Sequence, residues 1–337
     1  MALRVGIAGI SGYTGILLHR MIADHPDLTL TWVGAGRASG EPLSKTWPGV
    51  PGGEIPVEAV DADVIAARCD AVFLALPHGV SGVVGRDCHA RGVRVFDLGA
   101  DFRLRDPALY AATYGAPHPA PALLEQAVYG LPEKNRAALV GATLVAVPGC
   151  YPTATALAAL PLVEDGLVDW LIADCLSGIS GAGRNPSARN LYCEVSESAE
   201  AYGVAGAHRH TPEIEQLLGL PVSFTPHLVP MRRGMLATVH GRPARLPAAA
   251  SLRARYVERY ADCPLVEIVD APPATREVRG SGRCRIFPTV DPVRGVVSVF
   301  SAIDNLGKGA STQAMQCLNL SFGLPETRGI PLFPDAP

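Results

Sequence analysis

Short apolar runs alternate with amphipathic segments through the first third of the chain. Runs of roughly four to eight apolar residues are typical of strands that are buried on both faces. Such strands are predicted at 3–8, 28–34, 71–76, 93–98 and 143–147. Residues 15–25, between the first two runs, show helical spacing and end at Pro26. Strand, helix and strand in this order indicate a parallel sheet with crossover helices.

The apolar runs change character after residue 150, where polar residues interrupt them. This pattern predicts a mixed or antiparallel sheet with one solvated or interface face. Its predicted strands lie at 171–177, 222–226, 236–241, 265–269 and 296–302. The last segment, 310–320, predicts a helix, with apolar residues at Ala314, Cys317 and Leu318.

Length, charge and cysteine usage narrow the class of protein. The chain has 337 residues, which favours two domains, and its formal charge is −3 without a cluster of Lys and Arg. We therefore expect no nucleic-acid partner. No apolar stretch has membrane length and no charged leader precedes the first strand, so we expect a cytoplasmic protein without membrane contact. The eight cysteines form no C-x-x-C pair, and we expect no metal site.

A glycine-rich turn joins the first predicted strand to the first predicted helix. Residues 6–15 read G-I-A-G-I-S-G-Y-T-G, with glycines spaced by three. Such a turn lets the backbone approach a pyrophosphate, whose charge then meets the unpaired N–H groups of the helix. A tight turn of purely structural use is the alternative. The residues predicted to bind a dinucleotide here are Gly9, Ser11, Gly12, Tyr13, Thr14 and Gly15.

The residues after the second predicted strand indicate which dinucleotide binds. NAD sites usually hold the ribose 2′-hydroxyl with an Asp or Glu at this point. Here Arg37 and Ser39 follow the strand, and Glu41 is the first acid. An arginine and a hydroxyl suit a 2′-phosphate, which favours NADP over NAD. The alternative is that Arg37 is a solvated loop charge.

A cysteine stands at the turn between the last strand of this sheet and the next predicted helix. Residues 147–155 read V-P-G-C-Y-P-T-A-T, so Cys150 follows a Pro-Gly turn and precedes small and apolar residues. The N-terminus of a helix favours the thiolate, and parallel sheets bind ligands at the carboxyl ends of their strands. We predict that Cys150 is a nucleophile. A buried structural cysteine is the alternative.

Two histidines offer a partner for this thiol, because a thiolate nucleophile usually needs a base. Residues 206–216 read G-A-H-R-H-T-P-E-I-E-Q, and His208 and His210 precede a predicted helix. Thr211 is expected to cap that helix and Pro212 to open it, with Glu213 in the first turn. The alternatives are two histidines of a surface loop, or two metal ligands that lack a convincing third.

Nine stretches spread over nearly the whole chain carry a family resemblance. They are G-I-S-G-Y-T-G (9–15), F-L-A-L-P-H-G-V-S (73–81), D-L-G-A-D-F-R-L (97–104), Y-G-L-P-E (129–133), P-G-C-Y-P-T-A (148–154), S-G-I-S-G-A-G-R (177–184), H-R-H-T-P-E-I (208–214), P-H-L-V-P-M-R-R-G (226–234) and D-N-L-G-K-G-A (304–310). In these the chain resembles the N-acetyl-gamma-glutamyl-phosphate reductases, of the aspartate-semialdehyde dehydrogenase-like group. P-G-C-Y-P-T-A is specific, whereas the glycine turn alone is not. Val147 and Gly99 depart from the pattern, where asparagine and serine are common, and put the fine tuning of the site in doubt.

The resemblance implies an α/β chain of two domains. A Rossmann-type NADP-binding domain would be formed by residues 1–148 and 305–337. An α+β domain with a mixed sheet, at 149–304, would bind substrate, carry the catalytic residues and form a dimer interface. The helix predicted at 310–320 is expected to return to the first domain, as in other Rossmann-type enzymes. A homodimer or homotetramer is implied.

The resemblance also implies a reaction. The family reduces N-acetyl-gamma-glutamyl phosphate, a small acyl phosphate, to N-acetyl-glutamate semialdehyde with NADPH, in arginine biosynthesis. Cys150 would attack the gamma-carbonyl and release phosphate, leaving a thioester that is reduced to a thiohemiacetal and collapses to the aldehyde. His208 matches the family's acid/base histidine. The covalent route divides one difficult step into two easier ones.

Further binding residues follow from the same motifs. Arg103, in D-F-R-L, matches an arginine that holds phosphate in related dehydrogenases; a structural salt bridge is its alternative. Arg184 is expected to meet the substrate carboxylate. The substrate-binding residues implied are Arg103, Ser177, Gly178, Arg184, His210 and Glu213. The cofactor-binding residues implied beyond the glycine turn are Pro77, His78, Gly79, Asn305 and Lys308.

Two other functions stay open on the sequence. A related enzyme of lysine synthesis reduces an aminoadipyl phosphate attached to an acidic carrier protein, and a basic rim around the cleft would favour that substrate. A catalytically silent NADP-binding subunit is the other possibility, and the presence of both Cys150 and His208 argues against it. Aspartate-semialdehyde dehydrogenase itself fits less well, because P-G-C-Y-P-T-A is not its usual active-site sequence.

Overall fold

The computed structural model describes residues 2–36 and 40–335, and the chain forms two compact units. The first unit comprises Met1–Pro148 and Ala310–Ile330, and the second comprises Gly149–Gly309 and Pro331–Pro337. Residues 305–309 and the described part of the C-terminal tail, 331–335, pack with the second unit, whereas the family resemblance implied that they belong to the first. The searched residues contain no helix long and apolar enough to cross a membrane.

A parallel sheet forms the centre of the first unit. Within the described residues its six strands run in the order β2-β1-β3-β4-β6-β5, and every pair is parallel. The order reverses direction between β1 and β3, and ligands bind beside such a point in open α/β sheets. The strands are β1 (Leu3–Ala8), β2 (Leu28–Gly34), β3 (Ala71–Leu74), β4 (Arg94–Asp97), β5 (Val128–Tyr129) and β6 (Leu144–Ala146).

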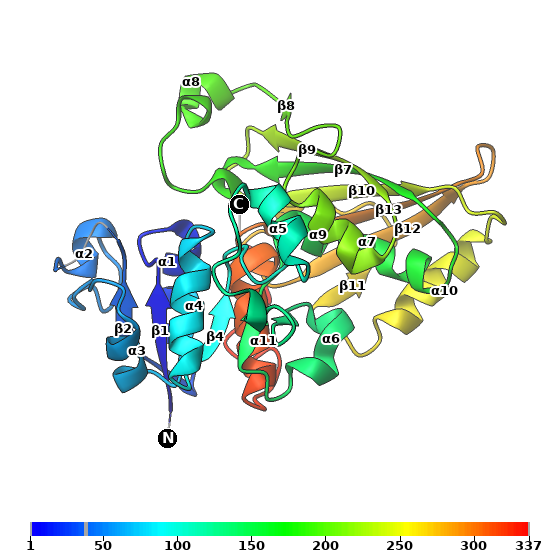
Figure 1. Ribbon diagram of the computed structural model, residues 1–337. Helices are drawn as coiled ribbons and strands as arrows, with labels where there is room; N and C mark the ends of the chain where they lie inside the picture. The colour runs from blue at the N-terminus through cyan, green and yellow to red at the C-terminus, as the bar shows by residue number, and fades with distance from the viewer. Residues whose placement is uncertain (1, 37–39, 336–337) are drawn as a thin grey trace. The chain divides into compact units, whose positions relative to one another are not determined.

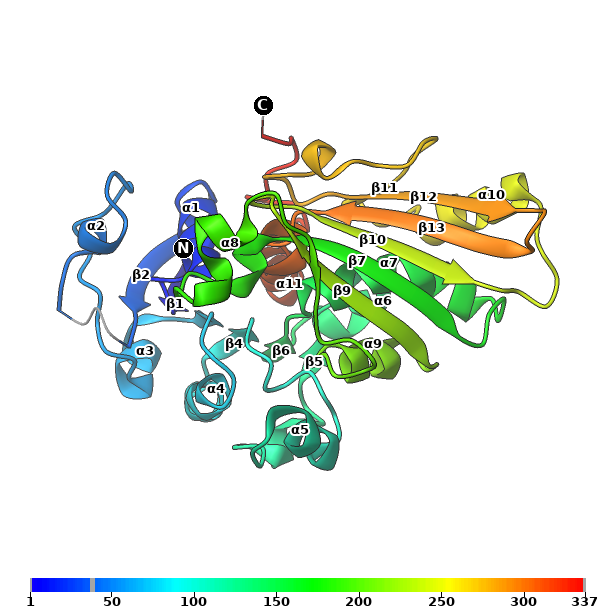
Figure 2. The same cartoon turned by 90° about the horizontal axis from the view of Figure 1, so that it is seen from above.

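Helices cover both faces of this sheet, as crossover connections require. Figure 2 shows α1 and α11 on one face and α3 and α4 on the other. The strands between them are almost wholly buried; Val5, Phe73 and Val95 have no exposed surface. The helices of this unit are α1 (Tyr13–Ala23), α2 (Leu43–Thr46), α3 (Ala62–Arg68), α4 (Val80–Ala90), α5 (Pro107–Tyr114), α6 (Pro132–Leu139) and α11 (Thr312–Ser321).

The second unit contains a mixed sheet. In the part of the chain that the structure describes, seven strands run in the order β11-β12-β13-β10-β7-β9-β8. The β11-β12 and β7-β9 pairs are parallel and the other pairs are antiparallel. The strands are β7 (Leu171–Gly178), β8 (Glu200–Ala201), β9 (Val222–Val229), β10 (Met235–Gly241), β11 (Val266–Ile268), β12 (Cys284–Asp291) and β13 (Val296–Ile303).

One face of the mixed sheet is covered by helices and the other is half-exposed. Figure 1 shows α7, α9 and α10 on one side of the sheet, and α7 packs directly on β10 and β13. Burial alternates along β10 and β13, so every second side chain faces the covered side. On the opposite side Leu176 is 37% exposed. The helices are α7 (Cys150–Glu164), α8 (Tyr192–Val195), α9 (Thr211–Leu218) and α10 (Ala249–Arg259).

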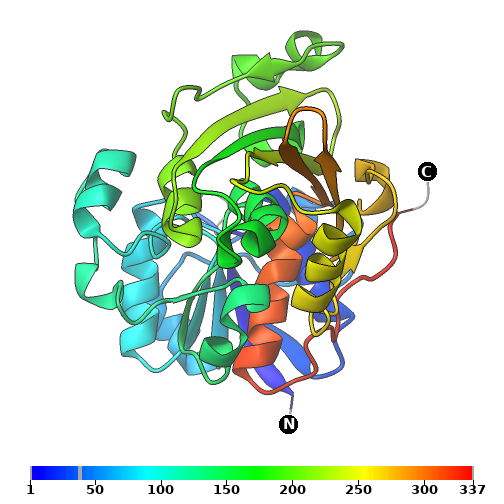
Figure 3. The same cartoon turned by 90° about the vertical axis from the view of Figure 1, so that its right-hand side faces the viewer.

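The strand predictions are confirmed in position, with ends that differ by at most three residues. The predicted C-terminal helix is also confirmed. It forms α11, which packs beside α6 and β4 and belongs to the first unit, as expected. Figure 3 shows it in orange along that unit. A π-helix at Gly307–Ser311 carries the chain from the second unit into α11.

Candidate active site and dinucleotide-binding turn

Cys150 begins the longest helix of the second unit. Gly149, with extended backbone, precedes the 15-residue helix α7, and no acidic side chain lies in its first turn. The thiol is half-buried, whereas the next four residues are buried. The end of a long helix presents unpaired N–H groups and a positive dipole, which favour a thiolate. The thiol thus occupies a position suited to a nucleophile.

A pocket of about 410 Å³ opens over this thiol. Its walls come from the start of α7, the end of β7 and the turn after it, and two loops that flank β8 and precede α9. Polar and aromatic side chains dominate it, which suits a small charged ligand. The lining residues are Cys150, Tyr151, Ser177, Gly181, Ala182, Arg189, Asn190, Tyr202, Gly203, Ala207, His208, Arg209, His210 and Leu228.

His208 lies among aromatic rings in this pocket. Its ring centroid is 5.6 Å from that of Tyr151, 5.3 Å from that of Tyr202 and 5.4 Å from that of Phe224. Burial lowers the pKa of His208 to about 4, and the Arg209 cation acts in the same direction. The imidazole is therefore neutral at physiological pH.

A backbone hydrogen bond assigns the tautomer of His208. The N–H of His210 donates to Nδ1 of His208 at 3.0 Å. Nδ1 must then hold a lone pair, so the neutral ring carries its proton on Nε2. In this arrangement His208 offers the pocket a hydrogen-bond donor rather than a base.

His210 and Glu213 connect the histidine loop to the cysteine turn. His210 is 6% exposed and immediately precedes α9, while the Glu213 carboxylate accepts a hydrogen bond from the Gly149 N–H at 3.0 Å. The expectation that Thr211 caps this helix is wrong. Thr211 is its first helical residue, because its own N–H already bonds the His208 carbonyl and the helix begins one residue earlier than the pattern suggested.

The other predicted substrate residues divide between the pocket and its surroundings. Ser177 lines the pocket and is buried. Gly178 follows it at the end of β7, where a Cβ would lie 2.8 Å from the Met231 carbonyl oxygen, so the glycine serves close packing. Arg184 is exposed and lies outside the lining, whereas Arg189 and Arg209 are part of it.

Arg103 belongs to the first unit and is 8% exposed. Its Nε donates to the Val147 carbonyl and its Nη2 to the Leu98 carbonyl, both at 2.8 Å. These carbonyls end β6 and β4, so the guanidinium ties two neighbouring strand ends together just before the Pro148 turn. The structure thus gives Arg103 backbone partners in its own unit.

The glycine turn of the first unit fits a dinucleotide phosphate. Gly9 has a φ of 95°, and a Cβ there would lie 2.2 Å from the Ala75 carbonyl oxygen. A Cβ on Gly15 would lie 2.4 Å from the Gly9 carbonyl oxygen. Gly12 precedes α1, and among the described residues a Cβ built on it would have one neighbouring atom within 4 Å, at 3.5 Å. Gly9 and Gly15 therefore close the turn, and Gly12 leaves open the approach to the helix N-terminus.

The neighbouring side chains of this turn are held from within the first unit. Trp47 Nε1 donates to the Ile10 carbonyl at 3.0 Å, and its ring lies 6.3 Å from that of Tyr13. The Thr14 carbonyl accepts a hydrogen bond from the Ser311 hydroxyl at 3.1 Å, and Ser11 is half-buried. These contacts fix the backbone that would face a phosphate.

The Pro77-His78-Gly79 turn ends at α4 and is supported by a buried carboxylate. Both oxygens of Asp101 accept from the Gly79 N–H, at 2.8 and 2.9 Å, and Tyr110 donates its hydroxyl at 2.6 Å. The start of α4 is thus already supplied with an internal anion, unlike the start of α1. The carboxylate holds the turn in place and leaves less room there for an external phosphate.

The remaining predicted cofactor residues lie in the second unit or outside the described residues. Asn305 accepts a hydrogen bond from the Gly234 N–H at 2.8 Å and donates to the Ser180 hydroxyl at 3.0 Å, so its amide has internal partners. Lys308 is fully buried. Arg37 and Ser39 lie outside the described residues. Among the residues searched, no group of three or more His, Cys, Asp or Glu is placed to hold a metal ion.

Sequence comparison supplies the family. The semialdehyde dehydrogenase NAD binding domain matches residues 4–142, and the semialdehyde dehydrogenase dimerisation domain matches residues 150–305. N-acetyl-gamma-glutamyl-phosphate reductase of Desulforudis audaxviator is 47% identical, over 98% of this chain and 99% of the relative. That of Halorhodospira halophila is 49% identical, over 97% and 98%. This chain belongs to the N-acetyl-gamma-glutamyl-phosphate reductase family. The family resemblance read from the motifs is confirmed.

Solved structures share the fold of this reductase family member at low sequence identity. Aspartate semialdehyde dehydrogenase II of Vibrio cholerae, complexed with ASA, superposes with a TM-score of 0.72 at 15% identity and covers 95% of this chain and 98% of its own. The Candida albicans enzyme with NADP gives 0.72 at 17% identity, over 95% and 99%. The predicted fold class is therefore confirmed, with a nicotinamide-dinucleotide-binding unit and a mixed-sheet unit.

Several site residues escaped the sequence analysis. Tyr151 and Tyr202 line the pocket and share a hydroxyl contact at 3.0 Å, and burial raises the pKa of both phenols. Arg189, whose guanidinium lies 4.6 Å from the centre of the Tyr202 ring, also lines it. Tyr151 stands next to Cys150 in a specific motif, which is a signal that could have found it. Tyr202 and Arg189 lie in the long connection between β7 and β9, where the sequence shows no motif that points to a site.

Proposed function

We propose that this chain reduces N-acetyl-gamma-glutamyl phosphate to N-acetyl-glutamate semialdehyde, with NADPH as reductant and release of phosphate, in arginine biosynthesis. The single observation that supports it best is the pocket in which Cys150, at the N-terminus of α7, shares walls with two histidines and two arginines. The identity of the substrate is taken from the names of two relatives, which are 47% and 49% identical to this chain over nearly its full length.

Cys150 acts as the nucleophile in this proposal. Its Sγ attacks the gamma-carbonyl carbon, the carbon–oxygen bond to phosphate breaks, and phosphate leaves with the bonding electrons. A thioester on Sγ remains. The helix N-terminus favours the thiolate that this attack requires, and the pocket keeps the acyl group beside the thiol.

In this proposal His208 is a neutral hydrogen-bond donor, whereas the resemblance implied that it is the acid/base histidine. With Nδ1 engaged by the His210 N–H, the Nε2–H is the group that can stabilise negative charge on the substrate oxygen. A neutral imidazole used in this way has precedent in enzymes that polarise carbonyls. His210, buried in the same pocket, is then the group proposed to receive the thiol proton, with Glu213 as its neighbour in α9.

The charge of the pocket fits the substrate. N-acetyl-gamma-glutamyl phosphate carries a carboxylate and a phosphate, and the pocket is lined by Arg189 and Arg209. We propose these two as the groups that attract its anions, with Arg184 at the margin. Ser177 and the turn that follows β7 line the pocket, and we propose that they border the acyl chain.

NADP is proposed as the nicotinamide cofactor. When bound it supplies the hydride that reduces the thioester. Gly12 and the N-terminus of α1 would hold its pyrophosphate, with Pro77, His78 and Gly79 beside the nicotinamide ribose. Arg37 and Ser39 would select the 2′-phosphate. We expect Arg37→Ala to raise the KM for NADPH about 10-fold and to leave the KM for NADH unchanged, measured by steady-state kinetics. Equal changes for both cofactors would contradict the assignment.

The half-exposed face of the mixed sheet is proposed as a self-association surface. The matched domain is described as a dimerisation domain, and Leu176 stands exposed on this face. We propose a homodimer or homotetramer, to be measured by light scattering. A reactive thiol and a reduced nicotinamide suit a reducing compartment, so the cytoplasm is the proposed location.

The test is the phosphate-dependent oxidation of N-acetyl-glutamate semialdehyde, followed as NADPH absorbance. Activity that depends on both phosphate and semialdehyde supports the proposal. Its absence in a well-folded preparation would refute it, and the carrier-linked aminoadipate semialdehyde would then be assayed. Inactivity with both would favour the silent NADP-binding subunit.

A further inference from the structure

We propose that the buried Asp304–Arg233 pair is a positioning unit for Cys150 and for one wall of its pocket. The inference rests on the proposed function, because it takes Cys150 as the nucleophile. Neither Asp304 nor Arg233 lines the pocket. Both act through backbone segments that they hold.

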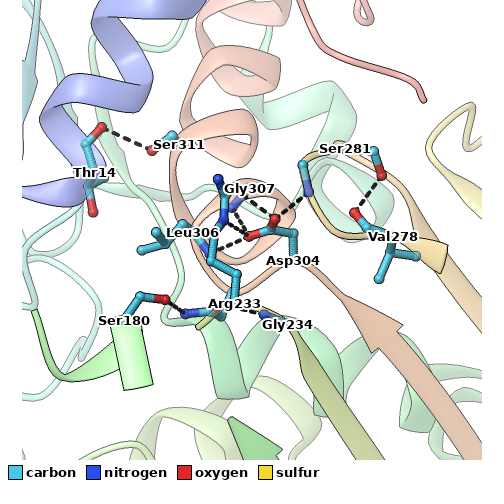
Figure 4. Close-up of polar contacts among 12 residues, drawn as sticks. Thr14, Ser180, Arg233, Gly234, Val278, Ser281, Asp304, Leu306, Gly307 and Ser311 are labelled. Carbon is cyan, nitrogen blue, oxygen red and sulfur yellow. Dashed lines mark hydrogen bonds and ion pairs between the residues drawn. The ribbon is translucent and has the colours of Figure 1, made fainter. Parts of the chain in front are cut away.

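One carboxylate gathers three separate segments of the second unit. Among the described residues four N–H groups donate to Asp304: Nε of Arg233 and the backbone N–H groups of Gly280, Leu306 and Gly307, and Nη2 of Arg233 completes an ion pair with Oδ2. The distances run from 2.6 to 3.2 Å, and the Asp304 side chain has no exposed surface. Figure 4 shows the loop of Arg233 and the turn after Asp304 converging on this carboxylate.

The position of the turn after Asp304 follows from these bonds. Leu306 and Gly307 donate to Oδ1, and the Gly309 N–H donates to the Asp304 carbonyl at 2.9 Å. Gly309 in turn lies against the nucleophile, because a Cβ built on it would lie 2.7 Å from the Cβ of Cys150. The carboxylate thus fixes the backbone that packs on Cys150.

The Arg233 loop reaches the pocket wall. Gly234 donates its N–H to Asn305, and Asn305 donates to the Ser180 hydroxyl. Ser180 belongs to the turn Ile179–Ala182, whose last two residues line the pocket. Moving the loop therefore moves the wall beside the acyl chain.

The geometry matters because nucleophilic attack requires close alignment. A misplacement of about 1 Å in a reacting group can cost a hundredfold in rate. Arg233 is the better residue to change, since its side chain is 13% exposed whereas that of Asp304 is fully buried. Arg233→Met keeps most of the apolar stem and removes the cation. Arg233→Lys keeps the charge and loses the two-pronged bond to the carboxylate.

The experiment compares Arg233→Met, Arg233→Lys and Gly309→Ala with the parent enzyme. We expect kcat to fall about 10- to 100-fold for Arg233→Met and less for Arg233→Lys, with the KM for NADPH within twofold of the parent. Gly309→Ala moves the same backbone from the other side and is expected to lower kcat without touching the ion pair. Glu277→Gln is the control, since it breaks a half-exposed pair with Arg285 in the same unit and is expected to keep kcat.

Thiol alkylation separates this proposal from the proposed function. The rate of iodoacetamide labelling is measured for Cys150 and, in the same sample, for exposed Cys193 as internal reference. We expect the Cys150:Cys193 rate ratio to change threefold or more in Arg233→Met and to stay constant in Glu277→Gln. A change below threefold in folded Arg233→Met would overturn the positioning proposal, even if activity falls. The ratio needs no substrate, so an inactive parent enzyme would refute the proposed function and leave this test intact.

Discussion

The N-termini of α1 and α7 share one backbone arrangement, and we propose different chemistry for each. Each follows a turn after a parallel strand of the first unit, and each is preceded by a glycine in extended conformation with no acidic residue in the first turn. At α1 the turn consists of closely packed glycines around Gly12. At α7 the first helical residue carries a thiol, and the Gly149 N–H already bonds Glu213.

The difference shows how neighbours decide the use of a helix dipole. At α1 the N–H of Gly12, just before the helix, bonds the backbone carbonyl of Gly9, and the anion of the proposed site arrives from solution. At α7 the corresponding N–H, that of Gly149, bonds the internal carboxylate of Glu213. The dipole of that helix then acts on the Cys150 thiol, which is part of the chain. The same backbone arrangement therefore favours a binding site in one unit and a nucleophile in the other.

Cys150→Ser gives the largest effect expected from the α7 terminus. Loss of a catalytic nucleophile typically costs about 10⁴-fold or more in kcat. We expect a loss of this size in phosphate-dependent semialdehyde oxidation, with the dissociation constant for NADPH unchanged in fluorescence titration. Cys193→Ser removes an exposed thiol and is the control, with kcat expected within twofold of the parent. Equal activity of the two variants would contradict the proposal that the N-terminus of α7 presents a catalytic thiol.

His208→Ala removes the histidine that lines the same pocket as Cys150. We expect kcat to fall about 10²-fold. His208→Asn, which keeps an N–H donor, should recover part of this loss if donation is what matters. A full recovery by exogenous base, and none by Asn, would instead indicate a proton acceptor.

The same histidine predicts a pH dependence of stability. Its pKa lies at about 4 in the fold, below the ordinary value of 6.5, so the unfolded chain binds the extra proton first. The fold therefore loses free energy of unfolding as the pH falls from about 6.5 to 4. Urea denaturation of parent and His208→Asn at both ends of this range measures it. An equal loss in the variant would contradict the neutral assignment.

Gly9→Ala and Gly12→Ala sharpen the α1 side of the comparison. Gly9→Ala places a Cβ 2.2 Å from the Ala75 carbonyl oxygen at positive φ, so we expect a loss of about 2 kcal/mol or more in the free energy of unfolding. Gly12→Ala meets no such atom, and we expect stability within about 0.5 kcal/mol but a KM for NADPH raised about 10-fold. The reverse pattern, with Gly12→Ala unstable and Gly9→Ala neutral, would refute this division of labour.

Glu213→Gln is expected to have the smallest effect on activity. It neutralises the carboxylate that accepts the Gly149 N–H just before α7. Removing a negative charge beside the helix N-terminus favours the thiolate. We expect alkylation of Cys150 at neutral pH to accelerate about threefold relative to Cys193, while turnover decreases. Slower alkylation would show that the carboxylate assists the thiolate instead.

The sequence pattern predicted the strands well where burial is continuous and poorly where edges or distant partners matter. Strand β12 was missed because Pro288 interrupts it. The structure tolerates the proline because β11 pairs only with residues 284–286 of β12, so Pro288 lies beyond that ladder and needs no N–H donor there. Helix α10 was missed although Leu252 and Tyr256, four residues apart, are its buried pair.

The chemical site was predictable to the extent that its residues share a local motif. The prediction of Cys150 as a nucleophile came from the strand–turn–helix pattern. His208 and His210 both precede a helix, and the choice of His208 rested on the family resemblance. Asp304 was not found, because its partners Arg233 and Gly280 lie 71 and 24 residues away. The tautomer of His208 could not be predicted from the sequence either, because it depends on a hydrogen bond from the backbone N–H of His210.

Trapping the acyl-enzyme tests the central claim most directly. The protein is incubated with N-acetyl-gamma-glutamyl phosphate without NADPH, digested and mapped by mass spectrometry. The account predicts an N-acetylglutamyl group on the peptide that contains Cys150, which hydroxylamine removes and which is absent from Cys150→Ser. Turnover of the same preparation on adding NADPH, with no adduct on Cys150 or with the adduct on another residue, would contradict it.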